Sequence, residues 1–412
     1  MLGSNKNIEL GFDNIAIIGG GRWARILSEV VCKIVPQSNF SVHSLNNSKG
    51  MRAWVSDRGL NSRIVVSSFL PSFPPNTSNA IIVANAARDH EKTVEWALEE
   101  GYSVLVEKPL CLNLISAQRL ATLAFTKNIY LATAHVFLFA SYVDAFAKLV
   151  VEENEIESIH VLWMDPKVES RYGEMKGYDS SLPVYADWLP HILSILGTFM
   201  PTPANLAKNI GFRAGGAHLN IDVNYDHIPC EIELVRNGKR RQRIVEVITR
   251  QKNIILDFSL EPGVIYNDGS LLCGDLNWSH DEKPVAKMLK SFLASSDADV
   301  RDDRLDLSIG LNANRVIDEV TVIYQNALRS WLNLRFANYQ NDIGNDLEYA
   351  LTEMLQQLHP NLTTPIDQRV NYVYQNLKYE LDKLLEDNTD GVEAAIIKVA
   401  NEGMSFDFRE NG

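Results

Sequence analysis

The sequence predicts an α/β protein that begins with a doubly wound parallel sheet and continues into an α+β domain. Apolar runs alternate with amphipathic stretches from Ile15 to Thr133. The segment Gly19–Ala24 has the pattern Gly-x-Gly-x-x-Ala and joins an apolar run to an amphipathic one. Farther along, strand-like runs follow one another with only short turns between them. Strands separated by helices pair in parallel through right-handed crossovers, whereas closely spaced strands pair antiparallel.

The first domain, residues 1–135, is predicted to alternate strands and helices. The strands are expected at Ile15–Ile18, Phe40–Ser44, Ile64–Ser67, Ala80–Ala84, Ser103–Val106 and Ile129–Thr133. The helices are expected at Arg22–Val35, Lys49–Asp57, Glu91–Glu100 and Leu114–Thr126. The proline-rich stretch Pro71–Pro75 is predicted to be a loop between two of these units.

The second domain, residues 136–330, is predicted to hold an open-faced, mostly antiparallel sheet. Its strands are expected at Ile156–Trp163, Ala217–Tyr225, Cys230–Arg236, Arg243–Arg250 and Ile254–Leu260. Turn signals at Asn237-Gly238 and Asn267–Gly269 indicate a meander. The basic run Lys239–Arg243 follows the first turn, and we interpret it as a solvated turn rather than a ligand site.

Residues 331–412 are predicted to form a helical extension. Apolar residues recur at helical spacing in Leu347–Leu358 and Val370–Leu384, and Thr364-Pro365 is a typical helix start. The extension carries no chemical motif. We therefore expect it to cover an edge, to support oligomerisation or to bind a protein partner.

Composition limits the class of partner. The chain of 412 residues is too long for one ordinary core, and its 46% hydrophobic content is typical of globular proteins. A formal net charge of −13 argues against nucleic acid and anionic membranes, since both favour a basic surface. The cysteines lack metal-binding spacing, no apolar run is long enough to span a bilayer, and Met1–Asp13 lacks a signal peptide. We expect a cytoplasmic protein with a small-molecule substrate and no metal site.

The glycine turn is the first candidate site. Gly19 allows the tight turn, Gly21 allows the backbone to approach a phosphate, and Ala24 allows helix and strand to pack closely. The first N–H groups of the following helix favour an anion. We therefore expect this turn, with Arg22 and Trp23, to contact a dinucleotide. The alternative is an ordinary tight turn formed by glycines.

The second candidate site is Glu107-Lys108-Pro109, at the end of the fifth predicted strand. Pro109 stops the strand, so Lys108 is expected at the carboxyl edge of a parallel sheet, where ligands bind. An ammonium group beside a cofactor there polarises a carbonyl or an imine. Without the glycine turn, a surface lysine would be the better interpretation.

The third candidate site pairs Asp187 with His191. They are four residues apart, so both lie on one face of a helix that is expected to start near Asp187. Pro190 favours that start, because proline is tolerated in a first helical turn. A carboxylate beside an imidazole orients it and biases its protonation. The alternative is a helix-capping aspartate followed by a core histidine.

In order and spacing, these residues resemble the glucose–fructose oxidoreductase / inositol dehydrogenase / rhizopine-catabolism (Gfo/Idh/MocA) family across about residues 14–330. The resemblance is carried by the glycine turn, the stretch Ile81–His90, the Glu-Lys-Pro motif and Asp187-x-x-x-His191. It implies a Rossmann domain that binds NAD(P), followed by an open-faced α+β domain that holds substrate and often forms oligomers. A homo-oligomer is therefore expected.

The resemblance also implies roles for individual residues. Lys108 matches the catalytic lysine that hydrogen-bonds the reacting group. His191 matches the general acid/base, and Asp187 matches its partner carboxylate. Glu107 matches a residue near the nicotinamide ribose, and Asn85 lies in the loop next to the cofactor.

The sequence departs from the family pattern around the substrate. Asn85–Arg88 replaces the common Thr-Pro-Asn-His, Leu182–Ala186 replaces glycines, and Ser194 stands where an acidic residue often follows. These changes leave three functions open. The favoured one is hydride transfer to or from the carbonyl or hydroxyl carbon of a sugar-like metabolite. The others are reduction of a C=N bond in a biosynthetic pathway, and a cofactor-binding sensor or assembly subunit without turnover.

The loop before the Asp–His pair is the expected substrate border. Arg171, Tyr172 and Tyr185 are predicted to contact substrate together with His191, because aromatic and basic side chains suit a ring or an anionic group. An ordinary exposed loop is an equally good interpretation.

The sequence predicts NADP(H) rather than NAD(H). An NAD site places a carboxylate after the second strand, where it binds the ribose hydroxyls. The segment Ser44–Lys49 contains no carboxylate. We instead expect Ser44, Asn46 and Lys49 to hold a 2′-phosphate, with Arg22 covering the adenine side.

Overall fold

In the computed structural model of the chain, the described residues are 12–35, 40–74, 76–153, 155–166, 169–171, 174–176, 182–213, 216–279, 282–294 and 301–337. The chain divides into two compact units. Unit 1 takes its residues from Met1–Ser158, Leu189–Ala204 and Glu246–Asp318. Unit 2 takes its residues from Ile159–Trp188, Asn205–Val245 and Glu319–Gly412.

Unit 1 contains a parallel six-stranded sheet, which confirms the predicted doubly wound fold. Its strands are β1 (Asn14–Ile18), β2 (Phe40–His43), β3 (Ile64–Ser67), β4 (Asn79–Val83), β5 (Ser103–Glu107) and β6 (Leu131–Ala134). They lie in the order β3-β2-β1-β4-β5-β6. The order reverses between β1 and β4, and ligands of such sheets bind at the carboxyl ends of the strands beside this reversal.

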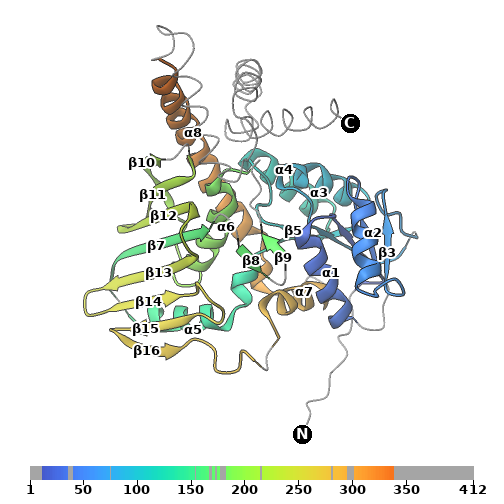
Figure 1. Cartoon of the computed structure of the whole chain (residues 1–412), viewed down its shortest axis with the longest axis horizontal. Helices are drawn as coiled ribbons and strands as arrows, with labels where there is room; N and C mark the ends of the chain where they lie inside the picture. Colours follow the sequence, from blue (N-terminus) through green and yellow to red (C-terminus); the bar gives the residue numbers. More distant parts are fainter. Residues whose placement is uncertain are drawn as a thin grey trace, which may run out of the picture. The chain divides into compact units, whose positions relative to one another are not determined.

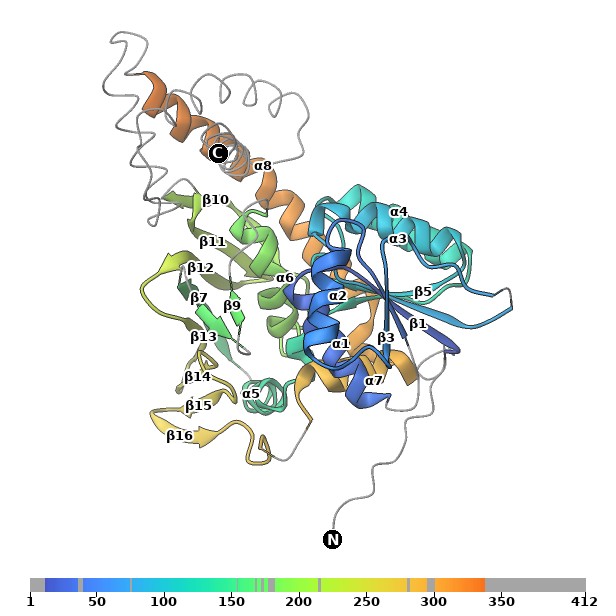
Figure 2. The ribbon, with the colours of Figure 1, turned by 45° about the vertical axis from the view of Figure 1, so that its right-hand side comes forward.

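Helices cover both faces of this sheet (Figure 2). On one face lie α1 (Arg22–Ile34), α2 (Ser48–Asp57) and α7 (Pro284–Ala294). On the other face lie α3 (His90–Glu99) and α4 (Leu114–Thr126). The sequence did not indicate α7, which fills the core with Phe292 stacked on Phe12 and Tyr130. Because both faces are covered, the strands form continuous apolar runs.

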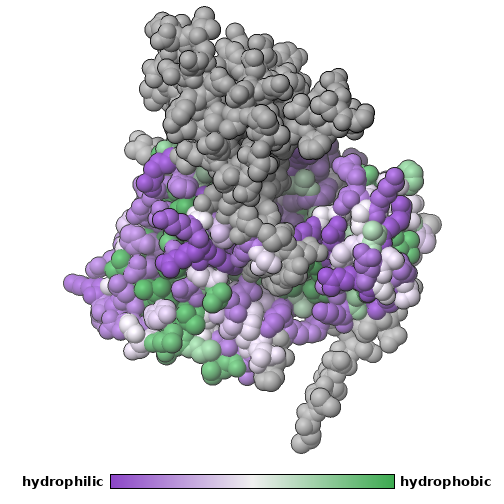
Figure 3. Space-filling model, viewed as in Figure 1, coloured by the Kyte–Doolittle hydropathy of each residue, from purple (hydrophilic) through white to green (hydrophobic). Residues whose placement is uncertain are grey.

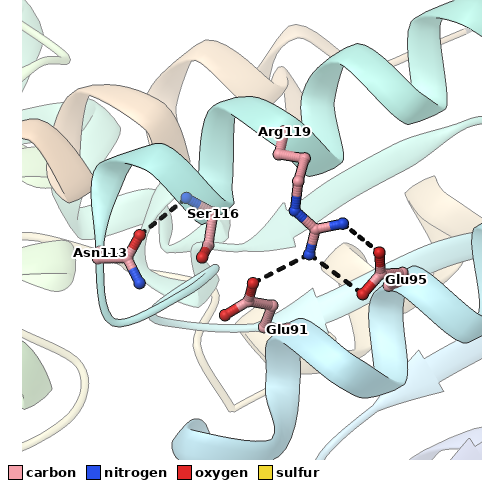
Figure 4. Close-up of polar contacts among 5 residues, drawn as sticks. All are labelled: Glu91, Glu95, Asn113, Ser116 and Arg119. Carbon is pink, nitrogen blue, oxygen red and sulfur yellow. Dashed lines mark hydrogen bonds and ion pairs between the residues drawn. The ribbon is translucent and has the colours of Figure 1, made fainter. Parts of the chain in front are cut away.

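Helices α3 and α4 are linked by an ion-pair network on their exposed side (Figure 4). Arg119 of α4 donates hydrogen bonds to Glu91 at 2.9 Å and to Glu95 at 3.1 Å, both on α3. The start of α4 is capped by Asn113, whose side chain accepts from the Ser116 N–H at 2.8 Å. Exposed ion pairs add little stability one by one. Together these ion pairs join α3 to α4.

The rest of unit 1 includes the short helix η2 (Val136–Phe139), α5 (Ser141–Val151) and three strands. The strands β14 (Asn253–Asp257), β15 (Val264–Asn267) and β16 (Ser270–Cys273) pair antiparallel. A hydrophobic area of the surface in Figure 3 lies where Figure 1 shows these strands. Leu271 and Leu272 of β16 and Leu276 after it are exposed apolar side chains.

The second sheet is mixed, with the strand order β10-β11-β12-β7-β13-β14-β15-β16. Its remaining strands are β7 (Ile156–Pro166), β10 (Asn205–Arg213), β11 (His218–Tyr225), β12 (Ile228–Gly238) and β13 (Gln242–Thr249). The mostly antiparallel sheet is confirmed, but the simple meander is wrong. Strand β7 lies between β12 and β13 and pairs with β12 in parallel. Parallel strands need a long crossover between them. The segment that joins β7 to β12 provides it, because it contains a helix (Val184–Leu196) and further strands.

The basic run in unit 2 is not a solvated turn throughout, so that interpretation is wrong for two of its residues. Strand β12 extends to Gly238, and the turn follows it. Arg243 donates to both carboxylate oxygens of Asp165, at 3.0 and 2.8 Å, and both side chains are buried. Arg241 lies 3.3 Å from Glu169. Arg241 directly precedes β13 and Arg243 is its second residue, and both side chains meet carboxylates.

A long helix, α8 (Leu307–Ala337), continues past the predicted domain boundary at residue 330. The predicted helical stretches beyond it lie outside the described residues, so a partner for this segment stays a prediction. None of the helices in the described part of the chain is both long and apolar enough to cross a membrane.

Candidate cofactor and catalytic site

The glycine turn follows β1 and is held against the end of β4. Gly19 has φ +153°, a conformation that L side chains rarely adopt, and a Cβ there would lie 2.4 Å from the Ala84 carbonyl oxygen. Its N–H donates to the His43 carbonyl at 2.9 Å. A Cβ on Gly20 would lie 2.0 Å from the Ser44 Oγ. These two glycines are therefore required by their protein neighbours.

Gly21 is different, because the space above it is open. A Cβ built there would meet no heavy atom within 4 Å. Gly21 is the N-cap of α1, no side chain caps the helix, and its first turn holds no acidic residue. The first N–H groups of a helix and its dipole attract an anion. This arrangement fits the pyrophosphate of a dinucleotide.

The loop after β2 carries the residues predicted to hold the adenosine end. Asn46 and Lys49 are exposed, and Lys49 lies in the first turn of α2. Ser44 is buried, and its Oγ accepts from the Asn47 N–H at 3.1 Å. Asn47, which the sequence argument did not single out, donates from Nδ2 to the Gly20 carbonyl at 2.7 Å. Ser44 and Asn47 thus shape the loop, whereas Asn46 and Lys49 are available to a ligand.

Asn85 follows β4 and faces the same edge of the sheet. Its Nδ2 donates to the Thr93 Oγ1 at 2.8 Å, which fixes the orientation of the amide. Its Oδ1 is buried and has no hydrogen-bond partner among the described residues. A buried acceptor without a donor is costly, so this oxygen is suited to accept a hydrogen bond from a bound ligand.

Glu107, the last residue of β5, is tied to the glycine-turn helix. Trp23, in the first turn of α1, donates its indole N–H to Glu107 Oε1 at 2.5 Å. Burial raises the pKa of Glu107 to about 7, while the Trp23 hydrogen bond and the Lys108 charge act in the opposite direction. The predicted cofactor residues Trp23 and Glu107 therefore meet at one place.

Lys108 comes directly after β5, at the carboxyl edge where it was expected. Glu107 pairs in register with Ala134 of β6, so Lys108 and His135 leave neighbouring strands side by side. His135 is completely buried. Burial lowers its pKa to about 4; the Pro190 carbonyl opposes this shift, and the Lys108 charge adds to it. Lys108 thus lies close enough to two neutral imidazoles, His135 and His90, for its charge to affect both.

His191 lies in α6 (Val184–Leu196) and contacts the segment of unit 1 that follows β6. Its ring packs edge-to-face on Phe137, with centroids 5.0 Å apart, and Phe137 follows β6 by three residues. The predicted helix exists, but the role given to Pro190 is wrong. The helix starts at Val184, so Pro190 is inside it rather than in the first turn. The missing N–H of Pro190 removes one helical bond.

Asp187 belongs to unit 2, and within that unit its partner is Arg236. The Arg236 guanidinium lies 3.8 Å from Asp187 Oδ2 and donates to the Leu182 carbonyl at 2.9 Å. Arg236 is 1% exposed. Sequence reasoning missed this arginine, although it ends a predicted strand whose alternation points it inward. Asp187 remains one helical turn before His191 in α6.

The predicted substrate residues are only partly described. Arg171 ends the short strand β8 (Glu169–Arg171), but its side chain and the whole of Tyr172 lie outside the described residues. Tyr185 is 3% exposed, and its hydroxyl donates to the Thr321 Oγ1 at 3.0 Å. Its ring also packs on Tyr324, which gives Tyr185 a packing role in unit 2.

Taken with the fold, the glycine turn is typical of a dinucleotide-binding domain. Residues 14–135 match the GFO_IDH_MocA family, described as "Oxidoreductase family, NAD-binding Rossmann fold". For the Rossmann domain, this match confirms the resemblance to Gfo/Idh/MocA oxidoreductases that the motifs predicted. Comparison of the sequence with curated proteins finds no match.

Solved structures share the fold beyond the Rossmann domain. UDP-N-acetylglucosamine 3-dehydrogenase GnnA from Acidithiobacillus ferrooxidans is 15% identical, with a TM-score of 0.59 over 75% of this chain and 97% of that one. The dehydrogenase MviM from Clostridium difficile is 15% identical, with a TM-score of 0.59 over 74% and 98%. KijD10, a 3-ketoreductase from Actinomadura kijaniata in complex with TDP-benzene and NADP, is 15% identical, with a TM-score of 0.58 over 74% and 95%. At these identities the likeness supports the fold alone.

Proposed function

We propose that the chain transfers a hydride between NADP(H) and a carbonyl or hydroxyl carbon of a sugar-like metabolite. The observations that support this best concern the ends of neighbouring strands: Lys108 directly follows β5, and His191 packs on Phe137, which lies three residues past β6. The glycine turn lies at the same edge, tied to Glu107 through Trp23. The sugar-like substrate rests on the likeness to GnnA and KijD10, whose names state a UDP-sugar dehydrogenase and a 3-ketoreductase.

In this proposal the residues of the site have separate roles in binding and catalysis. The open face of Gly21 and the start of α1 bind the pyrophosphate, and Asn85 and Glu107 border the nicotinamide end. The bound nicotinamide supplies or accepts the hydride. Lys108 stabilises negative charge on the substrate oxygen, and His191 gives or takes the proton at that oxygen. Asp187 on the same face of α6 orients the imidazole and is itself held by Arg236.

The test is a turnover screen with NADPH and NADH. It offers nucleotide-linked keto sugars, free sugars, cyclitols and cyclic imines, and it follows oxidation of the reduced cofactor. Reduction of a keto sugar supports the proposal. Turnover of imines alone would show that the substrate carries a C=N bond and not a carbonyl group. Tight NADPH binding with no turnover of any compound would favour a sensor or assembly subunit.

Variants separate the mechanism from the fold. Lys108→Met and His191→Ala should each lower kcat by about 100-fold or more, because each removes a charge-stabilising or proton-transferring group. NADPH affinity should change by less than about threefold, or roughly 0.7 kcal/mol. Lys92→Met, an exposed lysine on α3, is the matched control. Near-wild-type turnover in both site variants would refute the mechanism.

A homo-oligomer remains part of the proposal. Strand β16 is exposed along its length, and Leu271 and Leu276 are 62% and 85% exposed. Exposed apolar patches on soluble proteins mark interaction surfaces. Light scattering on the purified chain measures the oligomeric state, and Leu271→Glu should shift it toward the monomer.

A further inference from the structure

His90 links two loops at the carboxyl edge of the parallel sheet. It is the first residue of α3 and is 1% exposed. Its Nδ1 lies 2.7 Å from the Pro109 carbonyl oxygen, and its Nε2 lies 3.3 Å from the Asn85 carbonyl oxygen. The first carbonyl comes directly after Lys108, and the second belongs to the predicted cofactor loop.

Both neighbours of the ring are acceptors, so at most one of the two contacts is a hydrogen bond when the ring is neutral. Burial lowers the pKa of His90; the Pro109 and Asn85 carbonyls oppose this shift, and the Lys108 charge adds to it. A neutral imidazole carries one N–H. The shorter contact therefore takes the hydrogen, and Nδ1–H donates to the Pro109 carbonyl.

The segment after Lys108 is held at further points within unit 1. The Cys111 carbonyl accepts from Asn314 Nδ2 at 2.7 Å, and the Leu114 N–H donates to Asp318 Oδ1 at 3.3 Å. Of these three bonds, the one from His90 is nearest Lys108. The helix that carries His90 also carries Thr93, which fixes the Asn85 amide. One helix start thus supports both the lysine loop and the cofactor loop.

We propose that His90 is a positioning residue, which fixes the backbone next to Lys108 through the hydrogen bond from its Nδ1–H to the Pro109 carbonyl. The proposal rests on the proposed function for its kinetic consequences. A histidine that merely fills the core would be replaceable by any side chain of similar volume. A positioning histidine requires a donor at one particular ring position.

Two substitutions test where the donor must lie. Asparagine places its Nδ2 at the same bonded distance from the backbone as His Nδ1, so His90→Asn keeps a donor for Pro109. Glutamine places its Nε2 at the bonded distance of His Nε2, so His90→Gln removes the donor for Pro109 and offers one on the other side. His90→Phe keeps a ring of similar size and removes the donor.

The variants are compared by kcat for carbonyl reduction and by NADPH affinity from cofactor fluorescence. We expect His90→Asn to keep at least about a third of kcat and His90→Gln to lose about 30-fold. His90→Phe should lose about as much kcat as His90→Gln. NADPH affinity should stay within about threefold of the wild type in all three variants. Leu120→Ala, in the same core, is the control for a general loss of stability.

The proposal is overturned if the Asn and Gln variants are equally impaired, or if His90→Phe behaves as the wild type. It is also overturned if both losses simply follow the thermal midpoint, as in Leu120→Ala. Nitrogen NMR of ¹⁵N-labelled histidine, assigned with His90→Asn, provides a readout without turnover. The Nδ1–H tautomer supports the proposal, and the Nε2–H tautomer overturns it. If the wild type reduces no substrate, the proposed function fails and the tautomer still decides the role of His90.

Discussion

The indole N–H of Trp23 donates to Glu107 Oε1 at 2.5 Å and joins two motifs that are 84 residues apart in sequence. Trp23 follows the glycine turn, and Glu107 precedes Lys108. Burial raises the pKa of the Glu107 carboxyl group, and this hydrogen bond opposes the shift. It therefore couples the helix that is predicted to bind pyrophosphate with the strand that carries the predicted catalytic lysine.

Replacing Glu107 by glutamine should change how stability depends on pH. The pKa of Glu107 is about 7 in the folded chain, above its ordinary value of 4.5. Between these two values the folded state holds a proton that the unfolded state has lost, so the wild type loses stability as pH rises. Relative to Glu107→Gln, its free energy of unfolding should fall by about 1–3 kcal/mol between pH 4.5 and 7 and then level off. Urea unfolding of the cofactor-free protein across this range measures the difference.

The matched control is Glu100→Gln, which removes an exposed carboxylate at the end of α3. Its stability difference from the wild type should not follow the same curve. A flat difference for Glu107→Gln, or one that grows in favour of the wild type as pH rises, would contradict the burial of this carboxyl group.

The glycine turn allows stability and binding to be tested separately. Gly19→Ala should cost about 1–3 kcal/mol of stability, because it combines a strained φ with a close approach to the Ala84 carbonyl. Gly21→Ala meets open space, so its stability should change by less than about 1 kcal/mol. Its NADPH affinity should nevertheless fall at least tenfold, or about 1.4 kcal/mol. Thermal unfolding and fluorescence titration measure the two effects. Unchanged affinity in Gly21→Ala would mean that the cofactor does not approach this backbone.

Cofactor preference should depend on Lys49. Its exposed ammonium at the start of α2 is suited to a 2′-phosphate, and the loop offers no carboxylate for the hydroxyls of NADH. Lys49→Ala should weaken NADPH binding about fivefold or more, roughly 1 kcal/mol, and should change NADH binding by less than twofold. Lys33→Ala, an exposed lysine at the far end of α1, controls for net charge. Equal losses for both cofactors would refute the assigned phosphate contact, and a tenfold preference of the wild type for NADH would refute the choice of cofactor.

The Rossmann strands and helices were predictable because each has a recognisable local sequence pattern. Strands such as Ile15–Ile18 are buried on both faces and are therefore apolar runs, and glycine at position 19 marks a conformation that few residues tolerate. The place of Lys108 in the fold was also predictable, because Pro109 marks the end of the strand that precedes it. The functional roles of Lys108 and His191 stay predictions.

The missed features depend on contacts between distant segments. Nothing beside His90 in the sequence indicates that its ring meets Pro109, which is 19 residues away. Pro190 was misplaced because the first-turn preference of proline is only a tendency, and α6 accommodates the lost bond inside the helix. The position of β7 was missed because strand order depends on a crossover, which leaves no periodic signal.

Arg243 lies in a basic run that the sequence predicted to be solvated, but it forms a buried ion pair with Asp165. We expect this pair to be important for stability. The guanidinium also lies 4.3 Å from the Trp163 ring centre. Arg243→Met should cost about 3–5 kcal/mol, because it leaves the buried carboxylate without its cation. Adding Asp165→Leu to that variant should recover most of the loss, since neither charge is then left buried alone. Arg250→Met breaks an exposed ion pair with Glu155 and should cost less than about 1 kcal/mol. Urea unfolding of the four proteins measures these differences, and similar costs for the two arginine variants would show that the enclosed pair adds no more than the surface one.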